Sequence, residues 1–239
     1  MNRPVEVMED VWVLHNPTSG HNMGILVNEK SAVIIDPAVD MVDLEVIDKG
    51  LSEQGRAVEA IIHTYEASPR VTVWRPDVPR ISGEAFGARS PLPVSLSGWE
   101  VVPLSKQAPT RIALYNASNG VLYCGEVLAD TAANEAIPSL EGGSRWYINA
   151  LGFVKELDAK LLVPAQGSIA TGKRSIRKRI EADHNYVYDV RRLVITSIMG
   201  EVSLERVLAV TADLHEDFPL LQKHLANIRA VWAELSLES

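Results

Sequence analysis

The sequence has one cysteine, few aromatic residues and no long apolar run. Cys124 is the only cysteine among the 239 residues, which excludes internal disulfide bonds and cysteine-rich zinc sites and favours a reducing compartment. Apolar runs such as residues 161–165 are far shorter than the ~20 residues that a membrane span needs. No apolar stretch follows residues 1–6, as it would in a signal peptide. The sequence therefore predicts a cytoplasmic protein without a membrane segment.

Positive charge is scarce as well. The chain has 23 lysine and arginine residues against 31 aspartate and glutamate residues, and this net charge of −8 argues against a nucleic-acid-binding surface. Aromatic residues make up only 6% of the chain, too few for a platform on which bases stack. The one basic cluster, residues 173–179, lies within a helical pattern and is interpreted as a solvated helix face. We expect no nucleic-acid partner.

What remains is the composition of a folded domain, with 46% hydrophobic residues. The length allows one large domain, or one domain that carries a helical appendage. Short strand-like segments separated by turns dominate up to about residue 124, and helices dominate after it. Strands are predicted at 11–14, 24–27, 32–36, 58–62, 71–74, 99–102, 111–115, 121–124 and 161–163. Helices are predicted at about 41–54, from Ser144, from about Gly172, after Ser203, and through residues 218–235.

The C-terminal helices raise the question of what covers their apolar faces. The last helix has an apolar stripe, which must be buried either on the long helix of residues 175–198 or on a second copy of the chain in a homodimer. We favour the first alternative because the turn at residues 199–201 is short. We expect residues 1–200 to form one domain and residues 201–239 a helical extension packed on it. The stripe consists of Phe218, Leu221, Leu225, Ile228 and Trp232.

Two features precede the helix that begins near residue 144. Ser144 is placed to cap that helix, since a serine hydroxyl accepts a hydrogen bond from the first-turn backbone. The preceding glycines, Gly142 and Gly143, leave the helix N-terminus open to an anion. This second signal is weak because the segment lacks the lysine of a P-loop.

Several segments occur in a specific order. They are Val33-Ile34-Ile35-Asp36-Pro37, Ala60-Ile61-Ile62-His63-Thr64, residues 108–115, Asn119-Gly120-Val121-Leu122-Tyr123-Cys124-Gly125-Glu126 and Leu162-Val163-Pro164-Ala165-Gln166-Gly167. Their order resembles the metallo-β-lactamase superfamily over roughly residues 10–195. The resemblance implies an α/β fold, a four-layer αβ/βα sandwich, here with a C-terminal helical extension.

The metal motif of that family is degraded in this chain. The family motif HxHxDH holds two metal ions, whereas residues 63–68 read His-Thr-Tyr-Glu-Ala-Ser, with Tyr65 at the second histidine position. By the same match, Gln107 and Gln166 stand at the two remaining histidine positions, and Glu126 stands at that of the bridging aspartate. Glutamine, alanine and serine are poor ligands for zinc. We therefore expect no bound metal and no other cofactor.

The resemblance implies that the surviving polar side chains share one cleft. His63 could be a general base, Tyr65 a donor to an oxyanion and Glu126 an acid or base. Each also has a structural alternative. His63 could be a buried hydrogen-bonded histidine, Tyr65 could fill the volume that the metal ions vacate, and Glu126 could accept hydrogen bonds from backbone N–H groups. The candidates for substrate binding are His21, Glu66, Gln107 and Gln166.

Two functions remain open at this point. The first is a pseudo-enzyme, a binding or partner subunit that holds a small molecule or a protein without turning it over, and the concerted loss of metal ligands favours it. The second is a metal-independent hydrolase or lyase that acts on a small polar or thioester-like substrate through His63, Tyr65 and Glu126. It is favoured by the polar replacements, because an abandoned cavity would fill with apolar side chains. The fold alone does not decide between them.

Overall fold

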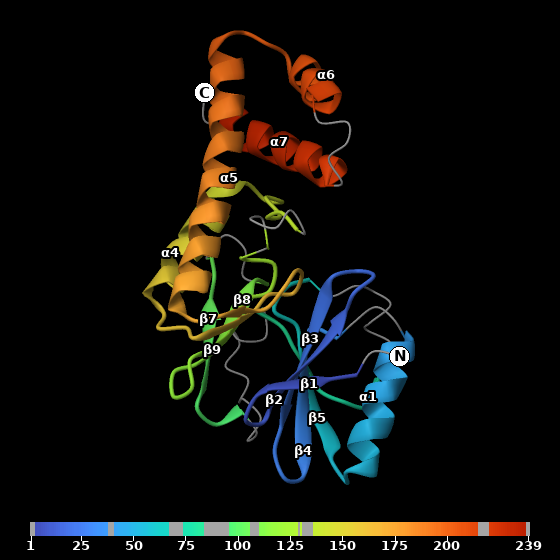
Figure 1. The fold of residues 1–239 in the computed structure, drawn as a ribbon. Helices are drawn as coiled ribbons and strands as arrows, with labels where there is room; N and C mark the ends of the chain where they lie inside the picture. The colour runs from blue at the N-terminus through green and yellow to red at the C-terminus, as the bar shows by residue number, and fades with distance from the viewer. Residues whose placement is uncertain are drawn as a thin grey trace.

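Two β-sheets pack face to face, and helices cover the outer face of each (Figure 1). The computed structural model describes residues 3–37, 41–66, 74–83, 96–105, 110–128, 130, 136–214 and 220–237. Within these ranges the layers follow the order helix, sheet, sheet, helix. The α/β sandwich that the order of segments predicts is therefore confirmed.

The first sheet has six strands that follow chain order. Its strands are β1 (Val5–Met8), β2 (Val11–Asn16), β3 (His21–Val27), β4 (Ser31–Ile35), β5 (Ala57–Ile62) and β6 (Arg80–Ile81). The first four strands are antiparallel. β4 and β5 are parallel because α1 (Met41–Glu53) crosses over between them, and β6 is parallel to β5. In β4, Ile34 packs against Leu44 of α1 while Val33 and Ile35 face the second sheet. Burial on both faces explains why this strand is a continuous apolar run.

The second sheet has five strands in the order β11-β10-β9-β8-β7. Its strands are β7 (Trp99–Pro103), β8 (Ile112–Asn116), β9 (Val121–Tyr123), β10 (Leu161–Val163) and β11 (Ala170–Thr171). The central pair, β9 and β10, is parallel, and α4 (Ser144–Glu156) connects the two strands. The outer face of this sheet lies under α4 and α5 (Lys173–Met199). The two parallel strands therefore end side by side at one edge of the sandwich.

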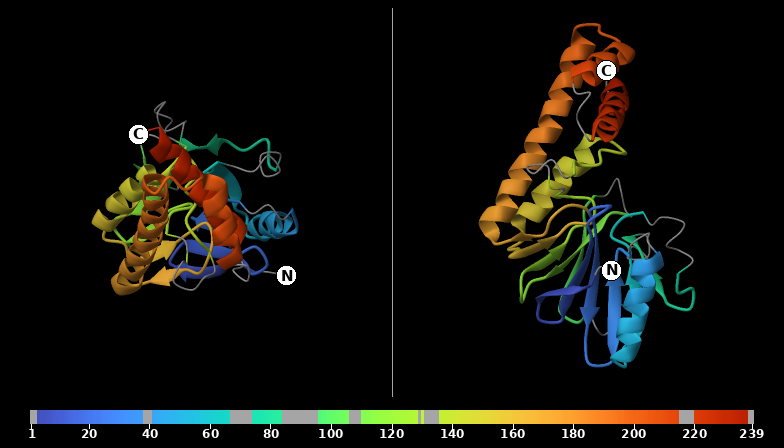
Figure 2. Two further views of the ribbon diagram at one scale, coloured as in Figure 1. Left: turned by 90° about the horizontal axis from the view of Figure 1, so that it is seen from above. Right: turned by 45° about the vertical axis from the view of Figure 1, so that its right-hand side comes forward.

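The C-terminal extension packs on the long helix of the same chain. Figure 2 shows α5 reaching beyond the sandwich, with α6 (Leu204–Leu214) and α7 (Leu221–Ser236) beside its far half. Leu225 and Ile228 of α7 are buried in the same cluster as Val187 and Val194 of α5. The apolar stripe of α7 thus has an intrachain partner. Phe218 lies outside the described residues, and both the domain boundary at residue 200 and a homodimer remain predictions.

The structure corrects one helix cap and confirms another. Gly143, not Ser144, is the N-cap of α4, and Ser144 is the first helical residue. The backbone N–H and the hydroxyl of Ser144 both donate to the Glu234 carboxylate of α7, so a carboxylate of the chain itself lies at this helix N-terminus. Ser203 caps α6, since its Oγ accepts the Arg206 N–H at 3.3 Å.

Three short strands are missing from the sequence prediction: β1, β6 and β11. The last two have only two residues each, too few for a periodic pattern. Of the predicted strand at 71–74, residues 71–73 lie outside the described ranges and Trp74 lies in a bend. No helix in the described ranges is both long and apolar enough to cross a membrane.

Candidate functional site

The parallel strands β9 and β10 bring two polar loops together at the edge of the sandwich. Tyr123 at the end of β9 pairs with Val163 at the end of β10, so residues 124–127 and 164–167 leave the sheet next to each other. The Ala165 N–H donates to the Gly125 carbonyl at 2.8 Å and joins the two loops. A Cβ on Gly125 would lie 2.6 Å from the Thr64 hydroxyl, and its φ of 58° is left-handed, so glycine is required at this turn.

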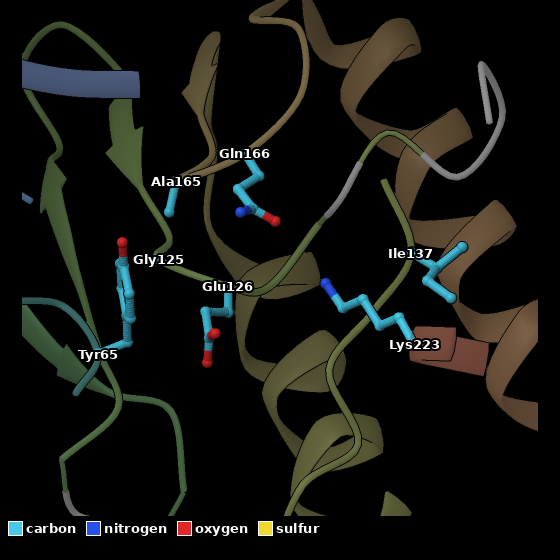
Figure 3. A pocket seen from close by; sticks show the side chains of 7 residues that line it. All are labelled: Tyr65, Gly125, Glu126, Ile137, Ala165, Gln166 and Lys223. Carbon is cyan, nitrogen blue, oxygen red and sulfur yellow. The ribbon is translucent and has the colours of Figure 1, made fainter. Parts of the chain in front are cut away.

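A small cavity opens between these loops and the C-terminal extension (Figure 3). Its volume is about 30 Å³, room for about two groups of the size of water. Four of the lining side chains are polar, and each comes from a different segment: Tyr65 after β5, Glu126 after β9, Gln166 after β10 and Lys223 on α7. The structure therefore brings together three of the residues that the sequence predicts, and adds Lys223.

Asn22 on β3 ties the Gln166 loop to the first sheet. Its side-chain amide donates to the carbonyls of Pro164 at 2.8 Å and Gly167 at 2.7 Å, and its backbone N–H donates to the Ala165 carbonyl at 2.8 Å. His15 donates to the Asn22 Oδ1 at 2.8 Å and fixes the orientation of the amide. The sequence analysis missed this residue, although an asparagine within an apolar strand is a signal for a buried hydrogen-bonding role.

The Gln166 loop is also tied to α5 through a buried ion pair. Arg179 Nη2 lies 2.9 Å from Asp130 Oδ2, and both side chains are less than 10% exposed. Ser168 donates to the same Asp130 oxygen and accepts from Arg179. A Cβ on Gly167 would lie 2.9 Å from the Asp130 Cβ, so the loop fits closely against this pair. Gln166 is therefore held on two sides.

Asp36 fixes the segment that carries His63 and Tyr65. Its carboxylate accepts hydrogen bonds from the Thr64 N–H at 2.7 Å and the Thr64 hydroxyl at 2.5 Å. Burial raises the Asp36 pKa to about 7, against the effect of these hydrogen bonds, and the nearby charge of Glu126 raises it further. Asp36 thus acts through Thr64 on the position of Tyr65 and changes its charge near neutral pH.

His63 does not line the cavity. Arg80 Nη1 donates to its Nε2 at 3.2 Å, and burial together with the charge of Arg80 lowers the His63 pKa to about 4. The ring is therefore neutral at pH 7, with its ring nitrogen lone pair directed at a guanidinium group. This arrangement matches the structural alternative for His63 and gives no support for a role as general base.

The other predicted substrate-binding residues lie in different surroundings. His21 donates through Nε2 to the Asp36 carbonyl at 2.8 Å, and burial lowers its pKa. Its backbone bridges to that of Gln166, so it supports the loop rather than the cavity wall. Glu66 is exposed and does not line the cavity. Gln107 lies outside the described residues.

Tyr65 and Glu126 have different electrostatic surroundings. Burial raises the pKa of the Tyr65 hydroxyl, and the carboxylates of Asp36 and Glu126 raise it further, so Tyr65 keeps its proton and can donate a hydrogen bond. Glu126 Oε2 lies 3.5 Å from Arg111 Nε. The Arg111 guanidinium is itself held 4.2 Å from the centre of the Trp146 ring. Arg111 therefore balances the charge of Glu126.

Lys223 is a second residue of the site that the sequence analysis missed. In the described part of the chain its ammonium group forms no hydrogen bond or ion pair. Burial lowers the Lys223 pKa, while the more distant carboxylates of Glu126 and Asp183 raise it. Figure 3 shows the side chain reaching from α7 toward Glu126. A lysine in the first turn of an amphipathic helix gives no sequence signal of such a position.

Two contacts fix the position of α7, and with it Lys223. Asn227 accepts the Leu140 N–H at 2.9 Å and donates to the Pro138 carbonyl at 2.8 Å. Glu234 accepts hydrogen bonds from the start of α4, as described above. The extension is thereby attached to the segment that also carries Ile137 of the cavity wall.

The cavity residues do not fit a zinc ion. Of the four polar side chains only Glu126 is a good ligand, and the ammonium group of Lys223 repels a divalent cation. His63 and His21 have other partners. In the ranges that the structure describes, no group of three histidine, cysteine, aspartate or glutamate side chains could hold a metal ion. A hydroxyl, an amide and an ammonium group can instead bind a small polar molecule.

Comparisons with known proteins establish the fold. The sequence matches no protein-family model and no curated protein. Among solved structures, a metallo-β-lactamase from Pontibacter korlensis is 15% identical, with a TM-score of 0.61 over 77% of this chain and 100% of that one. The metallo-β-lactamase DIM-1 is also 15% identical, with a TM-score of 0.54 over 77% of this chain and 97% of that one. Identities this low show the fold alone.

Proposed function

We propose that this chain, which has the metallo-β-lactamase fold, is a metal-free pseudo-enzyme that binds a small polar molecule without hydrolysing it. The observation that carries the proposal is the position of Lys223, whose ammonium group enters the cavity lined by Tyr65, Glu126 and Gln166. By resemblance, the positions of Tyr65, Glu126 and Gln166 hold metal ions in related proteins. A cation built into the chain takes over part of the charge that a metal would supply.

The polar groups around the cavity also argue against hydrolysis. Hydrolysis needs a group that activates water, either a metal ion or a general base near neutral pKa. His63 has a pKa of about 4 and is bonded to Arg80. Glu126 is paired with Arg111. Neither group is placed as a free base, which supports binding over turnover.

The test combines metal analysis with activity assays. The purified full-length chain is incubated with zinc, dialysed and analysed for bound metal, and it is then assayed on lactam, ester and thioester substrates. An active metallo-β-lactamase treated in parallel is the control. We expect no stoichiometric zinc and no turnover above background. One zinc per chain held after dialysis, or zinc-dependent hydrolysis, would overturn the proposal.

A second function is favoured by one observation, the lowered pKa of Lys223. A lysine with a lowered pKa beside Glu126, with the Tyr65 hydroxyl as a proton donor, is a possible acid–base set for a metal-independent lyase or hydrolase on a small polar or thioester-like substrate. In this version Lys223 takes the role that the sequence assigns to His63. Metal-independent turnover that Lys223→Met abolishes would favour it over the pseudo-enzyme.

The location and the partners of the chain belong to the same proposal. The single cysteine and the acidic composition support a cytoplasmic protein without a nucleic-acid partner. A protein partner and a homodimer remain predictions. Size measurement in solution by light scattering would test the homodimer.

A further inference from the structure

We infer that the protein has a second binding site, an apolar pocket between α1 and the outer face of the first sheet, which takes a small molecule with an apolar chain or ring and an anionic end. This pocket shares no lining residue with the cavity at Glu126, and the inference does not rest on the proposed function. Three observations lead to it: a part of the sheet that α1 leaves uncovered, a glycine of α1 beside open space, and two arginines at the rim.

One helix is too narrow to cover the whole first sheet. Six strands that lie about 4.8 Å apart form a sheet about 24 Å wide, whereas a helix with its side chains is about 10–12 Å in diameter. α1 lies along one side of this sheet (Figure 1), where it contacts β5 and packs on Ile34 of β4. A pocket of about 210 Å³ lies between α1 and the residues of β2 and β3 on the same face. The pocket therefore follows from the width of the sheet.

The walls of this pocket are apolar. Trp12 and Ile25 are paired across β2 and β3 and form one wall, and Val46 and Ile47 of α1 form the opposite wall. A cavity of about 150 Å³ lined by aliphatic and aromatic side chains is large enough to bind benzene. The pocket therefore admits an aromatic ring or a chain of about six carbon atoms, which gains free energy by leaving water.

Gly50 of α1 keeps the pocket open. It lies four residues after Val46, on the same face of the helix, and both residues line the pocket. Glycine is unfavourable inside a helix, and neither a left-handed φ nor a close neighbour requires it here, since an added Cβ would meet no atom within 4 Å. The space beside Gly50 is part of the pocket, and a larger side chain at this position would fill it.

The rim of the pocket is positively charged, although the chain has a net charge of −8. Arg3 and Arg56 both line the pocket, and none of its described lining residues is acidic. Arg56 is held by neutral acceptors, which include the Asn28 carbonyl at 2.8 Å. The nearby acids of α1, Asp48 and Glu53, each lie within 4 Å of another cation. An anionic end on the ligand is therefore complementary to the rim.

The test is an NMR titration of the ¹⁵N-labelled full-length chain with three soluble probes. Hexanoate has both the apolar chain and the charge, 1-hexanol has the chain alone, and acetate has the charge alone. The Trp12 indole N–H and the backbone N–H groups of Ile25 and Val27 report binding at the pocket. We expect saturable shifts of these signals with hexanoate, and binding at least about threefold weaker for 1-hexanol and at least about tenfold weaker for acetate.

Two variants test the apolar and the charged part of the site separately. Gly50→Leu fills the pocket and should weaken hexanoate binding at least about tenfold. Gly152→Leu is the matched control and should bind hexanoate as the wild type does, since Gly152 is an exposed glycine of α4 whose added Cβ would also meet no atom within 4 Å. Arg3→Gln should weaken hexanoate binding about two- to fivefold and leave 1-hexanol binding unchanged. The Tm of each variant checks its fold.

Several results would each overturn the inference. They are the absence of a saturable shift with hexanoate, equal binding of hexanoate and either of the other probes, and hexanoate binding that Gly50→Leu or Arg3→Gln leaves unchanged. A wild-type homodimer that Gly50→Leu separates, as measured by light scattering, would show instead that a second copy of the chain occupies the pocket. The comparison of the three probes needs no variant and holds even if Gly50→Leu does not fold. Failure here would leave the metal-free proposal intact, because that proposal concerns other residues.

Discussion

Glu234 on α7 is expected to stabilise the protein by capping a different helix, α4. Its Oε2 accepts the Ser144 N–H and the Ser144 hydroxyl, both at 2.6 Å, and its Oε1 accepts the Arg145 N–H at 3.2 Å. Arg191 adds an ion pair at 3.5 Å, and the Glu234 side chain is only 12% exposed. Burial alone would raise the Glu234 pKa, but these hydrogen bonds and the charge of Arg191 outweigh it, and the pKa is lowered. The ionised form is therefore the form that stabilises the fold.

The variant Glu234→Gln removes the charge and keeps the side-chain shape. A helix cap contributes about 1 kcal/mol and a hydrogen bond to a charged group about 1.5–3 kcal/mol, so we expect a loss of about 2 kcal/mol. In a chain of this size that loss lowers the Tm by about 4–8 °C. A lowered pKa means that the contribution is complete above the unfolded-state pKa and disappears as the pH falls through the folded-state pKa. The Tm difference should therefore narrow at acidic pH.

Thermal unfolding followed by circular dichroism, at neutral and acidic pH, measures this difference. Glu181→Gln is the matched control, since Glu181 is an exposed residue of α5 that no described contact holds. If both variants have the wild-type Tm at neutral pH, the carboxylate of Glu234 does not act as a cap that stabilises the fold. If the Tm difference of Glu234→Gln is the same at both pH values, its ionisation is not the cause.

Three further outcomes are expected. Because the Asp36 pKa is raised to about 7, the folded protein keeps a proton that the unfolded chain releases, so the Tm should fall as the pH rises from the unfolded-state pKa toward 7. Asp36→Asn should lack this fall of Tm with pH, and an equal fall in both proteins would contradict the assignment. Arg179→Met leaves Asp130 buried without its ion-pair partner, and the free energy of unfolding measured in urea should fall by about 3–5 kcal/mol. A decrease under about 1 kcal/mol would show that the ion pair is not a main support of the Gln166 loop. Truncation before Ser203 uncovers the apolar face of α5, so the shortened chain should be aggregated or unfolded, as measured by size-exclusion chromatography. A soluble monomer with unchanged Tm would contradict this role of the extension.

The layers of the fold were predictable because their signals are local. Ile34 lies in a run of apolar residues that only a strand covered on both faces explains, and α7 repeats its apolar residues at helical spacing. The helix cap at Ser144 was predicted wrongly because the actual acceptor, Glu234, is 90 residues away in sequence. Local sequence patterns identify elements, whereas the partners of polar groups depend on packing that joins distant segments.

The same limit explains the outcome at the candidate site. Tyr65, Glu126 and Gln166 could be placed together because each follows a strand at the same edge of the sandwich. The direction of the His63 ring depends on Arg80, which belongs to a two-residue strand without a sequence signal. Lys223 reaches the cavity only because α7 folds back onto α5. Helical periodicity identifies the apolar face of a helix, but it does not show which polar residue of that helix lies next to a distant loop.

The proposed metal-free site needs another way to limit the repulsion between its buried carboxylates, and three features of the structure supply it. In the family that the motif resembles, metal ions neutralise the carboxylates at these strand ends. Here the Glu126 carboxylate is balanced by Arg111, burial raises the pKa of the Asp36 carboxyl group to about 7, and Lys223 supplies a cation from a separate helix. Each change removes part of the repulsion that loss of a metal would create between buried carboxylates. Reintroducing histidine ligands at one or two positions would leave Lys223 in the cavity, so metal binding should require removal of Lys223 as well.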